Sequence, residues 1–153
     1  MKKNLVSNSI KAMFMVGTLD ILAAFIQYFI KTQKNPIAVL KFIASGVFGS
    51  DAFTGGNKMA LFGLVFHYFI ALLFTLIFFW LYPQIKLLIK NKIVMGVIYG
   101  SFIWIIMQFV VLPLSNAPAL KITFQGAIIA VLTLILCIGI PLSFLAARNQ
   151  QKQ

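Results

Sequence analysis

Four long apolar runs dominate the pattern of hydrophobic and polar positions along the chain. They cover about residues 12–30, 60–82, 93–114 and 124–147. A helix of about 20 mostly apolar residues crosses a hydrocarbon core about 30 Å thick. The runs are continuous, whereas strands of a membrane β-barrel alternate apolar and polar residues. The pattern therefore predicts an all-α fold, an integral membrane bundle of four transmembrane helices in a single domain over residues 1–153.

A fifth and shorter apolar stretch separates the first two runs, at about residues 36–48. Asn35 suits an N-cap and Pro36 suits the first helical position that follows it. Apolar side chains recur at helical spacing at Ile37, Leu40, Ile43, Ala44 and Val47. The stretch is too short to span a bilayer, so we expect an interfacial or re-entrant helix between the first and second spans.

A glycine-rich segment, "SGVFGSDAFTGGNK" at residues 45–58, ends this short helix. Its glycine spacing is wrong for a phosphate loop, and Lys58 is not followed by Ser or Thr. Its acidic content is too low for a calcium loop. The segment is expected to be a turn in which Asp51 caps the next turn or pairs with Lys58, the alternative for Asp51 being a role in ligand entry.

Composition and charge place the chain in a membrane. Of its 153 residues 61% are apolar and 10% are charged, against about 25% charged in an ordinary soluble domain. The net charge of +11 comes from basic residues that flank the apolar runs. Lipid bilayers with anionic headgroups are therefore the expected partner, and nucleic acid is not.

The distribution of lysine and arginine predicts the topology. With the N-terminus inside, the inner segments carry Lys2, Lys3, Lys11, Lys86, Lys90, Lys92, Arg148 and Lys152. The outer segments carry Lys31, Lys34, Lys41, Lys58 and Lys121. Eight basic residues against five favour a multi-pass protein with both termini in the cytoplasm.

Polar residues inside the spans are the candidate site: Asp20 and Gln27 in the first span, His67 in the second and Gln108 in the third. An intramembrane Asp costs about 2.5 to 3.5 kcal/mol on insertion scales, so its presence calls for a reason. Asp20 and His67 either lock the bundle through hydrogen bonds or handle a proton or ligand. At 1.5 Å per residue, we expect His67, Gln27 and Gln108 at about one level and Asp20 about 8 Å away in height, a difference that helix tilt can narrow or widen.

Each span also carries a stripe of small or polar residues on one helical face. The stripes are Gly17, Asp20, Ala24 and Gln27; Gly63, His67, Ala71 and Thr75; Gly96, Gly100, Trp104 and Gln108; and Gly126, Ala130, Thr133 and Cys137. Small residues let helices approach closely in lipid, so the stripes predict the interior of the bundle. The Gly96-x-x-x-Gly100 pair has a second interpretation, as the contact face of a dimer.

The residues that membrane enzymes use are not arranged for catalysis. The chain has no Glu, its one His lacks Cys or carboxylate companions at metal-ligand spacing, and no Ser lies in a nucleophile elbow. We therefore expect no catalytic residue, no metal site, no cofactor and no enzymatic activity.

One stretch has a characteristic order of elements, "FIASGVFGSDAFTGGNKMALFGLVFHYFIALLF". It contains an apolar half-helix, then a glycine-rich turn, then a span with Gly63 and His67. This layout, over residues 13–147, resembles that of small uncharacterised bacterial four-span inner-membrane proteins. The resemblance implies a bacterial inner membrane and no particular activity.

Two functions remain open. The first is a structural or accessory membrane protein, with a second copy or another membrane protein as its partner. The alternative is permeation of a small solute, ion or proton along Asp20, His67, Gln27 and Gln108. The spans show no convincing inverted repeat, which counts against a secondary transporter.

Overall fold

The computed structural model describes residues 2–119 and 122–150, and these form helices and short connections with no strand among them. The first half contains α1 (Lys2–Thr32), α2 (Ile37–Phe48), α3 (Asp51–Thr54) and α4 (Gly56–Leu88). The third run forms α5 (Lys92–Ile106), the π-helical η1 (Met107–Val111) and α6 (Leu112–Leu114). The fourth forms α7 (Phe124–Leu134), the π-helical η2 (Ile135–Gly139) and α8 (Ile140–Gln150).

Within these residues, four helices are long and apolar enough to cross a membrane. They are Asn8–Thr32, Gly56–Leu88, Lys92–Leu114 and Phe124–Arg148. The predicted all-α architecture is confirmed, including the shorter apolar helix α2 between the first and second spans. The first two helices continue beyond the predicted apolar runs, because helical hydrogen bonding does not stop where the side chains become polar.

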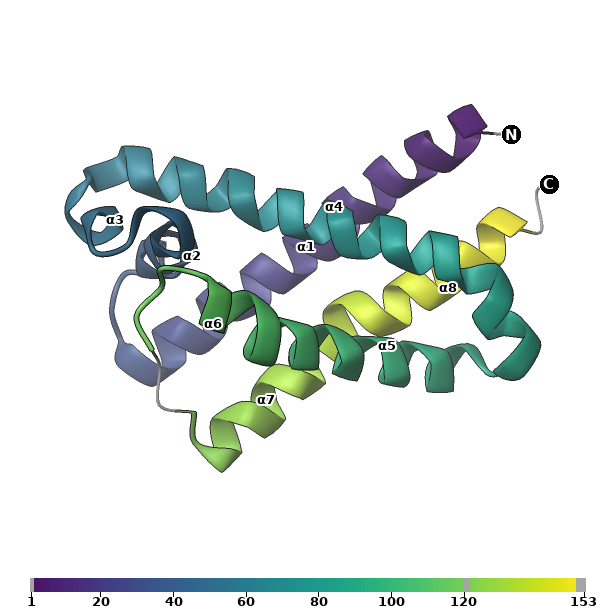
Figure 1. The fold of residues 1–153 in the computed structure, drawn as a ribbon. Helices are drawn as coiled ribbons and strands as arrows, with labels where there is room; N and C mark the ends of the chain where they lie inside the picture. The colour runs from purple at the N-terminus through teal and green to yellow at the C-terminus, as the bar shows by residue number, and fades with distance from the viewer. Residues whose placement is uncertain (1, 120–121, 151–153) are drawn as a thin grey trace.

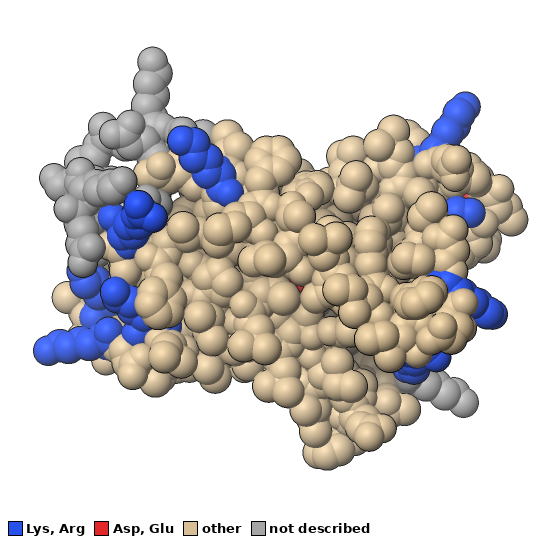
Figure 2. All heavy atoms as spheres, turned by 180° about the vertical axis from the view of Figure 1, so that it is seen from behind, with Lys and Arg blue, Asp and Glu red and all other residues tan. Residues whose placement is uncertain are grey.

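The four spans run alternately up and down. Figure 1 shows both termini and the α4–α5 connection at one end of the molecule, called here the terminal end. The segment with α2 and α3 and the α6–α7 connection lie at the opposite end. Figure 2 shows lysine and arginine side chains gathered towards both ends, with other residues covering the middle of that face. A band free of basic side chains between two basic ends is what a bilayer-spanning bundle requires.

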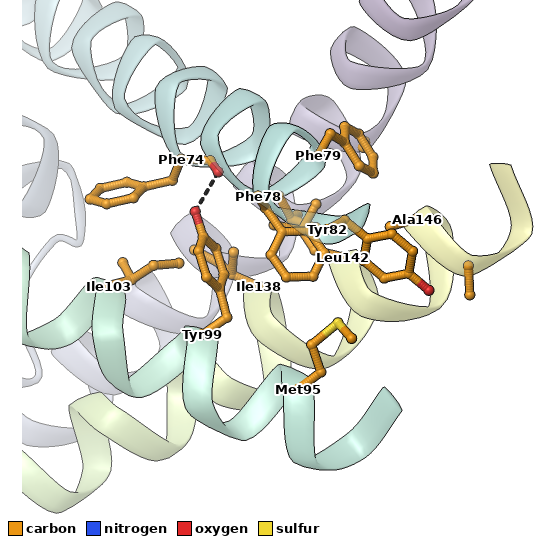
Figure 3. Packing of buried hydrophobic residues seen from close by; sticks show 13 residues of the cluster. Phe74, Phe78, Phe79, Tyr82, Met95, Tyr99, Ile103, Ile138, Leu142 and Ala146 are labelled. Carbon is orange, nitrogen blue, oxygen red and sulfur yellow. Dashed lines mark hydrogen bonds between the residues drawn. The ribbon is translucent and has the colours of Figure 1, made fainter. Parts of the chain in front are cut away.

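The main hydrophobic core lies towards the terminal end and joins α1, α4, α5, η2 and α8. Figure 3 shows aromatic side chains of α4 facing α5, with Phe78 and Tyr99 at a ring-centroid distance of 4.5 Å. The Tyr99 hydroxyl donates a hydrogen bond to the backbone carbonyl of Phe74, at 2.5 Å. This bond satisfies the one polar atom that Tyr99 brings into the core.

Glycines bring α5 into backbone contact with the fourth span. A Cβ added at Gly96 would lie 2.7 Å from the Ile140 Cα, and one at Gly100 would lie 2.6 Å from the Ile135 Cα. From the other side, a Cβ at Gly139 would lie 2.1 Å from the Gly96 carbonyl oxygen. The Gly96-x-x-x-Gly100 pair therefore packs against the chain's own fourth span.

The two π-helical segments precede prolines at the same offset. η1 ends two residues before Pro113, and η2 ends two residues before Pro141. The backbone N–H of Leu112 donates to Met107, and that of Ile140 donates to Ile135, which are i→i−5 bonds. Because a proline ring clashes with the carbonyl four residues earlier, the extra residue in the turn relieves the clash without ending the helix.

The short helix α2 lies across α4. Leu40, near its start, faces Gly63, where an added Cβ would lie 1.9 Å from the Leu40 carbonyl oxygen. Phe48, at its other end, contacts Phe62 and Phe66 with ring-centroid distances of 5.3 and 6.0 Å. Both ends of α2 thus meet one short stretch of α4, and Figure 1 shows α2 nearly end-on. α2 therefore packs across α4 as a separate short helix.

Polar residues hold both ends of α2. The Asn35 side chain accepts a hydrogen bond from the Ile37 N–H at 3.0 Å, although α2 begins at Ile37, so Pro36 rather than Asn35 occupies the N-cap position. At the other end, the Asn116 backbone N–H donates to the Gly46 carbonyl at 2.9 Å, and its side-chain amide donates to the Val47 carbonyl at 3.1 Å. The α6–α7 connection therefore caps the short helix.

Candidate functional site

The candidate site lies where α1 crosses α4, and a glycine makes that crossing possible. A Cβ added at Gly17 would lie 3.1 Å from the ring of Tyr68 and 3.3 Å from the Ala71 Cβ. The absence of a side chain at Gly17 therefore lets α4 approach the α1 backbone and exposes the Gly17 carbonyl oxygen to a side chain of α4.

Two adjacent hydrogen bonds join the helices at this crossing. His67 Nε2 lies 2.8 Å from the Gly17 carbonyl oxygen, and the Tyr68 hydroxyl lies 2.8 Å from the Thr18 hydroxyl. Because a carbonyl oxygen only accepts, His67 Nε2 must carry the hydrogen. The neutral form of His67 in this contact is therefore the tautomer with its hydrogen on Nε2, and its Nδ1 carries none.

Asp20 completes the site one helical turn after Gly17. Its half-buried carboxyl group interacts electrostatically with His67 on α4 and with Cys137 on η2. Among the described residues the carboxylate forms no hydrogen bond and no direct ion pair with His67. Asp20 thus interacts electrostatically with an imidazole and with a thiol, each from a different neighbouring span.

The expected difference of about 8 Å in height between Asp20 and His67 holds for upright helices, and tilt changes it. The bond from His67 to Gly17 places the imidazole beside the turn of α1 that carries Asp20. The prediction counted residues along upright helices from the apolar boundaries. In the structure α1 and α4 extend past those boundaries and cross each other. The number of residues between a boundary and a side chain therefore does not give the height of that side chain along the bundle.

Gln27 belongs to a separate contact. It lies seven residues beyond Asp20, which is about 10 Å along a helix. Its side-chain amide donates to the Thr133 hydroxyl at 2.5 Å, and that hydroxyl donates to the Ile129 carbonyl at 2.8 Å. Gln27 therefore joins α1 to α7.

Gln108 lies apart from both contacts. It lines a cavity of about 330 Å³ between α2 and the connection after α6, together with Phe42 and Ser115. The four polar candidates of the spans thus do not form one cluster, and only Asp20 and His67 come together.

Asp51 is exposed at the end opposite the termini, in the first turn of the four-residue helix α3. Its backbone carbonyl accepts hydrogen bonds from Gly55 N–H and the Thr54 hydroxyl. The described residues show no ion pair between Asp51 and Lys58. Gly49 and Gly56 have φ values of 60° and 65°, so two glycine turns flank the helix that the sequence presented as a plain turn.

Four partners in these contacts were not assigned from the sequence. Thr18 and Tyr68 adjoin Gly17 and His67, and their pairing follows once those neighbours meet. Thr133 and Cys137 were recognised only as members of one stripe, because their interactions with Gln27 and Asp20 depend on how the fourth span packs. In the part of the chain that the structure describes, no three His, Cys, Asp or Glu side chains gather as metal ligands.

The fold and its lipid-compatible exterior define a multi-pass helical membrane protein. Large apolar side chains remain exposed along all four spans, Phe69 on α4 and Phe109 on η1 among them. Comparisons with protein-family models, with curated proteins and with solved structures found no match to this chain.

Proposed function

We propose that the protein is a structural or accessory membrane protein without enzymatic activity of its own. It resides in a bacterial inner membrane with both termini in the cytoplasm, and it assembles with a second copy or with another membrane protein. The observation that supports this role is the use made of the polar side chains within the spans. His67, Tyr68 and Gln27 all bond to another helix of the same chain.

These bonds suit a rigid bundle. An interhelical hydrogen bond in a membrane is worth about 0.6 kcal/mol on average and up to about 2 kcal/mol. Together with the glycine contacts between α5 and η2, they hold the helices at fixed crossings. A rigid bundle whose exterior is apolar between its two basic ends provides a surface on which another membrane protein assembles.

Permeation of a proton or small ion is the second candidate, and Asp20 is the residue that favours it. Asp20 is half-buried in the middle of a span and has an imidazole nearby. Proton relays in membrane proteins are commonly built from such acidic and histidine side chains. Among the described residues, the Asp20 carboxyl group takes part in none of the interhelical hydrogen bonds, so those bonds do not explain its presence.

Proteoliposomes separate the two functions. The accessory role predicts no proton or ion flux above that of empty vesicles, for the wild-type protein and for Asp20→Asn alike. The permeation role predicts a flux that Asp20→Asn abolishes. Thr133→Val is the matched control, because it removes the Gln27 contact while leaving Asp20 and His67 in place. A flux lost in Asp20→Asn and kept in Thr133→Val would overturn the accessory role.

Gentle extraction from the native membrane tests the assembly. Native mass spectrometry of the extracted protein should show a second copy or another subunit bound to the chain. A chain recovered only as a monomer, across detergents that preserve known complexes, would contradict the proposal.

A further inference from the structure

Two neighbouring hollows at the terminal end share a lysine. The first, of about 550 Å³, lies where α4 ends and α5 begins, and Lys86, Lys90 and Lys92 line it. The second, of about 450 Å³, lies between α1 and α8, and Lys92 and Arg148 line it. Volumes of this size are typical of small-molecule sites. Lys92 thus stands between two hollows that each carry further basic residues.

The carboxylate side chains of the sequence lie away from Lys90, Lys92 and Arg148. The two acidic residues of the sequence are Asp20, within the α1 span, and Asp51, at the opposite end of the molecule. Figure 2 shows the basic side chains gathered at the terminal end. A ligand with more than one negative charge would complement this cluster.

Lys92 is the most enclosed of these cations. It is half-buried, and its ammonium lies 5.5 Å from the ring centroid of Phe144 on α8. The Asn91 side chain already accepts from the Ile93 and Val94 N–H groups at the start of α5. Side-chain ammonium groups, rather than the helix N-terminus, therefore offer the donors in this region.

The walls of both hollows are apolar as well as basic. Leu87 and Met95 line the first, and Phe144 and Leu145 line the second. Leu87 and Phe144 remain exposed on the outside of the bundle. A ligand that placed charge against the lysines would therefore also lay hydrocarbon against these walls, which a nucleic acid or a soluble anion does not do.

We propose that the two hollows bind the headgroup of an anionic phospholipid with two phosphates, of the diphosphatidylglycerol (cardiolipin) type. One phosphate lies in each hollow, and Lys92 contacts both. The acyl chains follow the apolar walls into the bilayer. The site is independent of the accessory function proposed above, since it needs only that this end lies at a membrane surface.

Native mass spectrometry of the full chain in detergent, supplied with cardiolipin, phosphatidylglycerol and phosphatidylethanolamine, tests the site. We expect cardiolipin to be retained most strongly. The double variant Lys90→Gln and Lys92→Gln should weaken its retention by roughly 30-fold, which is about 2 kcal/mol at 1.4 kcal/mol per tenfold. The matched control is Lys31→Gln with Lys34→Gln, two exposed lysines at the opposite end of the molecule. Thermal unfolding should show that both double variants remain folded.

Each outcome of this experiment either supports the site or overturns it. Loss of cardiolipin in the first double variant, with retention in the control, supports the site. Equal retention in both variants, or equal loss in both, overturns it. Retention of phosphatidylglycerol as strong as that of cardiolipin overturns the assignment of one phosphate to each hollow.

Discussion

His67 Nε2 donates a hydrogen bond to the backbone carbonyl oxygen of Gly17 across a distance of 2.8 Å. The residues that follow each of them, Tyr68 and Thr18, form a second bond of the same length. One helix crossing is thus held at two consecutive positions. A glycine at residue 17 keeps the two helices close, because an added Cβ would lie only 3.1 Å from the Tyr68 ring.

Removing the imidazole should loosen this crossing. We expect His67→Ala to lower the free energy of unfolding by about 1 to 3 kcal/mol, because it removes an interhelical bond and leaves a space between the helices. Tyr68→Phe keeps the ring and removes only the bond to Thr18, so it should cost less, about 0.6 to 1.5 kcal/mol. Denaturant titration in mixed micelles measures both. Two variants as stable as the wild-type protein would show that the crossing rests on other contacts.

A methyl group at Gly63 should displace α2. The added Cβ would meet the Leu40 carbonyl oxygen at 1.9 Å, and backbone atoms cannot swing aside as a side chain does. Gly63→Ala is therefore expected to destabilise the protein by about 1 to 3 kcal/mol. Protease sensitivity within residues 37–48 should rise with it.

Gly46→Ala is the control for this prediction. Gly46 is also helical, but its added Cβ would lie 3.6 Å from Ser115, an ordinary contact. Alanine has the higher helix propensity, so this variant should be neutral or more stable, by up to about 1 kcal/mol. Equal damage from the two substitutions would contradict the assigned packing of α2 on α4.

Substitution at Gly100 distinguishes packing within the chain from packing between chains. Gly100→Ala would bring a Cβ within 2.6 Å of the Ile135 Cα, so α5 and η2 must separate. The expected result is a loss of about 1 to 3 kcal/mol in unfolding free energy with an unchanged oligomeric state. Light scattering of the purified protein measures the second quantity. A change in oligomeric state without loss of stability would favour the dimer interpretation.

The proposed topology can be tested by cysteine labelling in a Cys137→Ser background. Asn57→Cys is exposed at the end with α2 and α3, and Lys90→Cys is exposed at the terminal end. An impermeant thiol reagent added to intact cells should label the first and spare the second. The reverse pattern would place the termini outside the cytoplasm.

The hydropathy of the sequence was sufficient to predict the four spans and α2. Each span must satisfy the bilayer by itself, so a local run of apolar residues is enough to predict it. The small-residue stripes were a partial guide. Gly17, Gly63, Gly96 and Gly100 all face another helix, whereas a Cβ at Gly126 of the fourth stripe would meet only the side chain of its own N-cap residue Thr123. The stripe does not name the partner, however, and Gly63 faces α2 rather than another span.

Two prolines in the sequence indicate where the π-helical segments occur. Pro113 and Pro141 each interrupt a long apolar run, and a proline within a helix must be accommodated upstream. The structure accommodates both by an extra residue per turn at η1 and η2. The kind of accommodation was not predictable, because a kink or a broken helix would also have relieved the clash.

Location in a membrane, helix number and the residues able to pack closely are local properties of this chain, and its amino-acid order alone determines them. The meeting of Asp20 with His67 and Cys137, the pairing of Gln27 with Thr133 and the isolation of Gln108 arise only in the tertiary structure. The physical reason is geometric. Residues at matched depths meet only if their helices cross with the right tilt and rotation, and backbone contacts at a few glycines decide both.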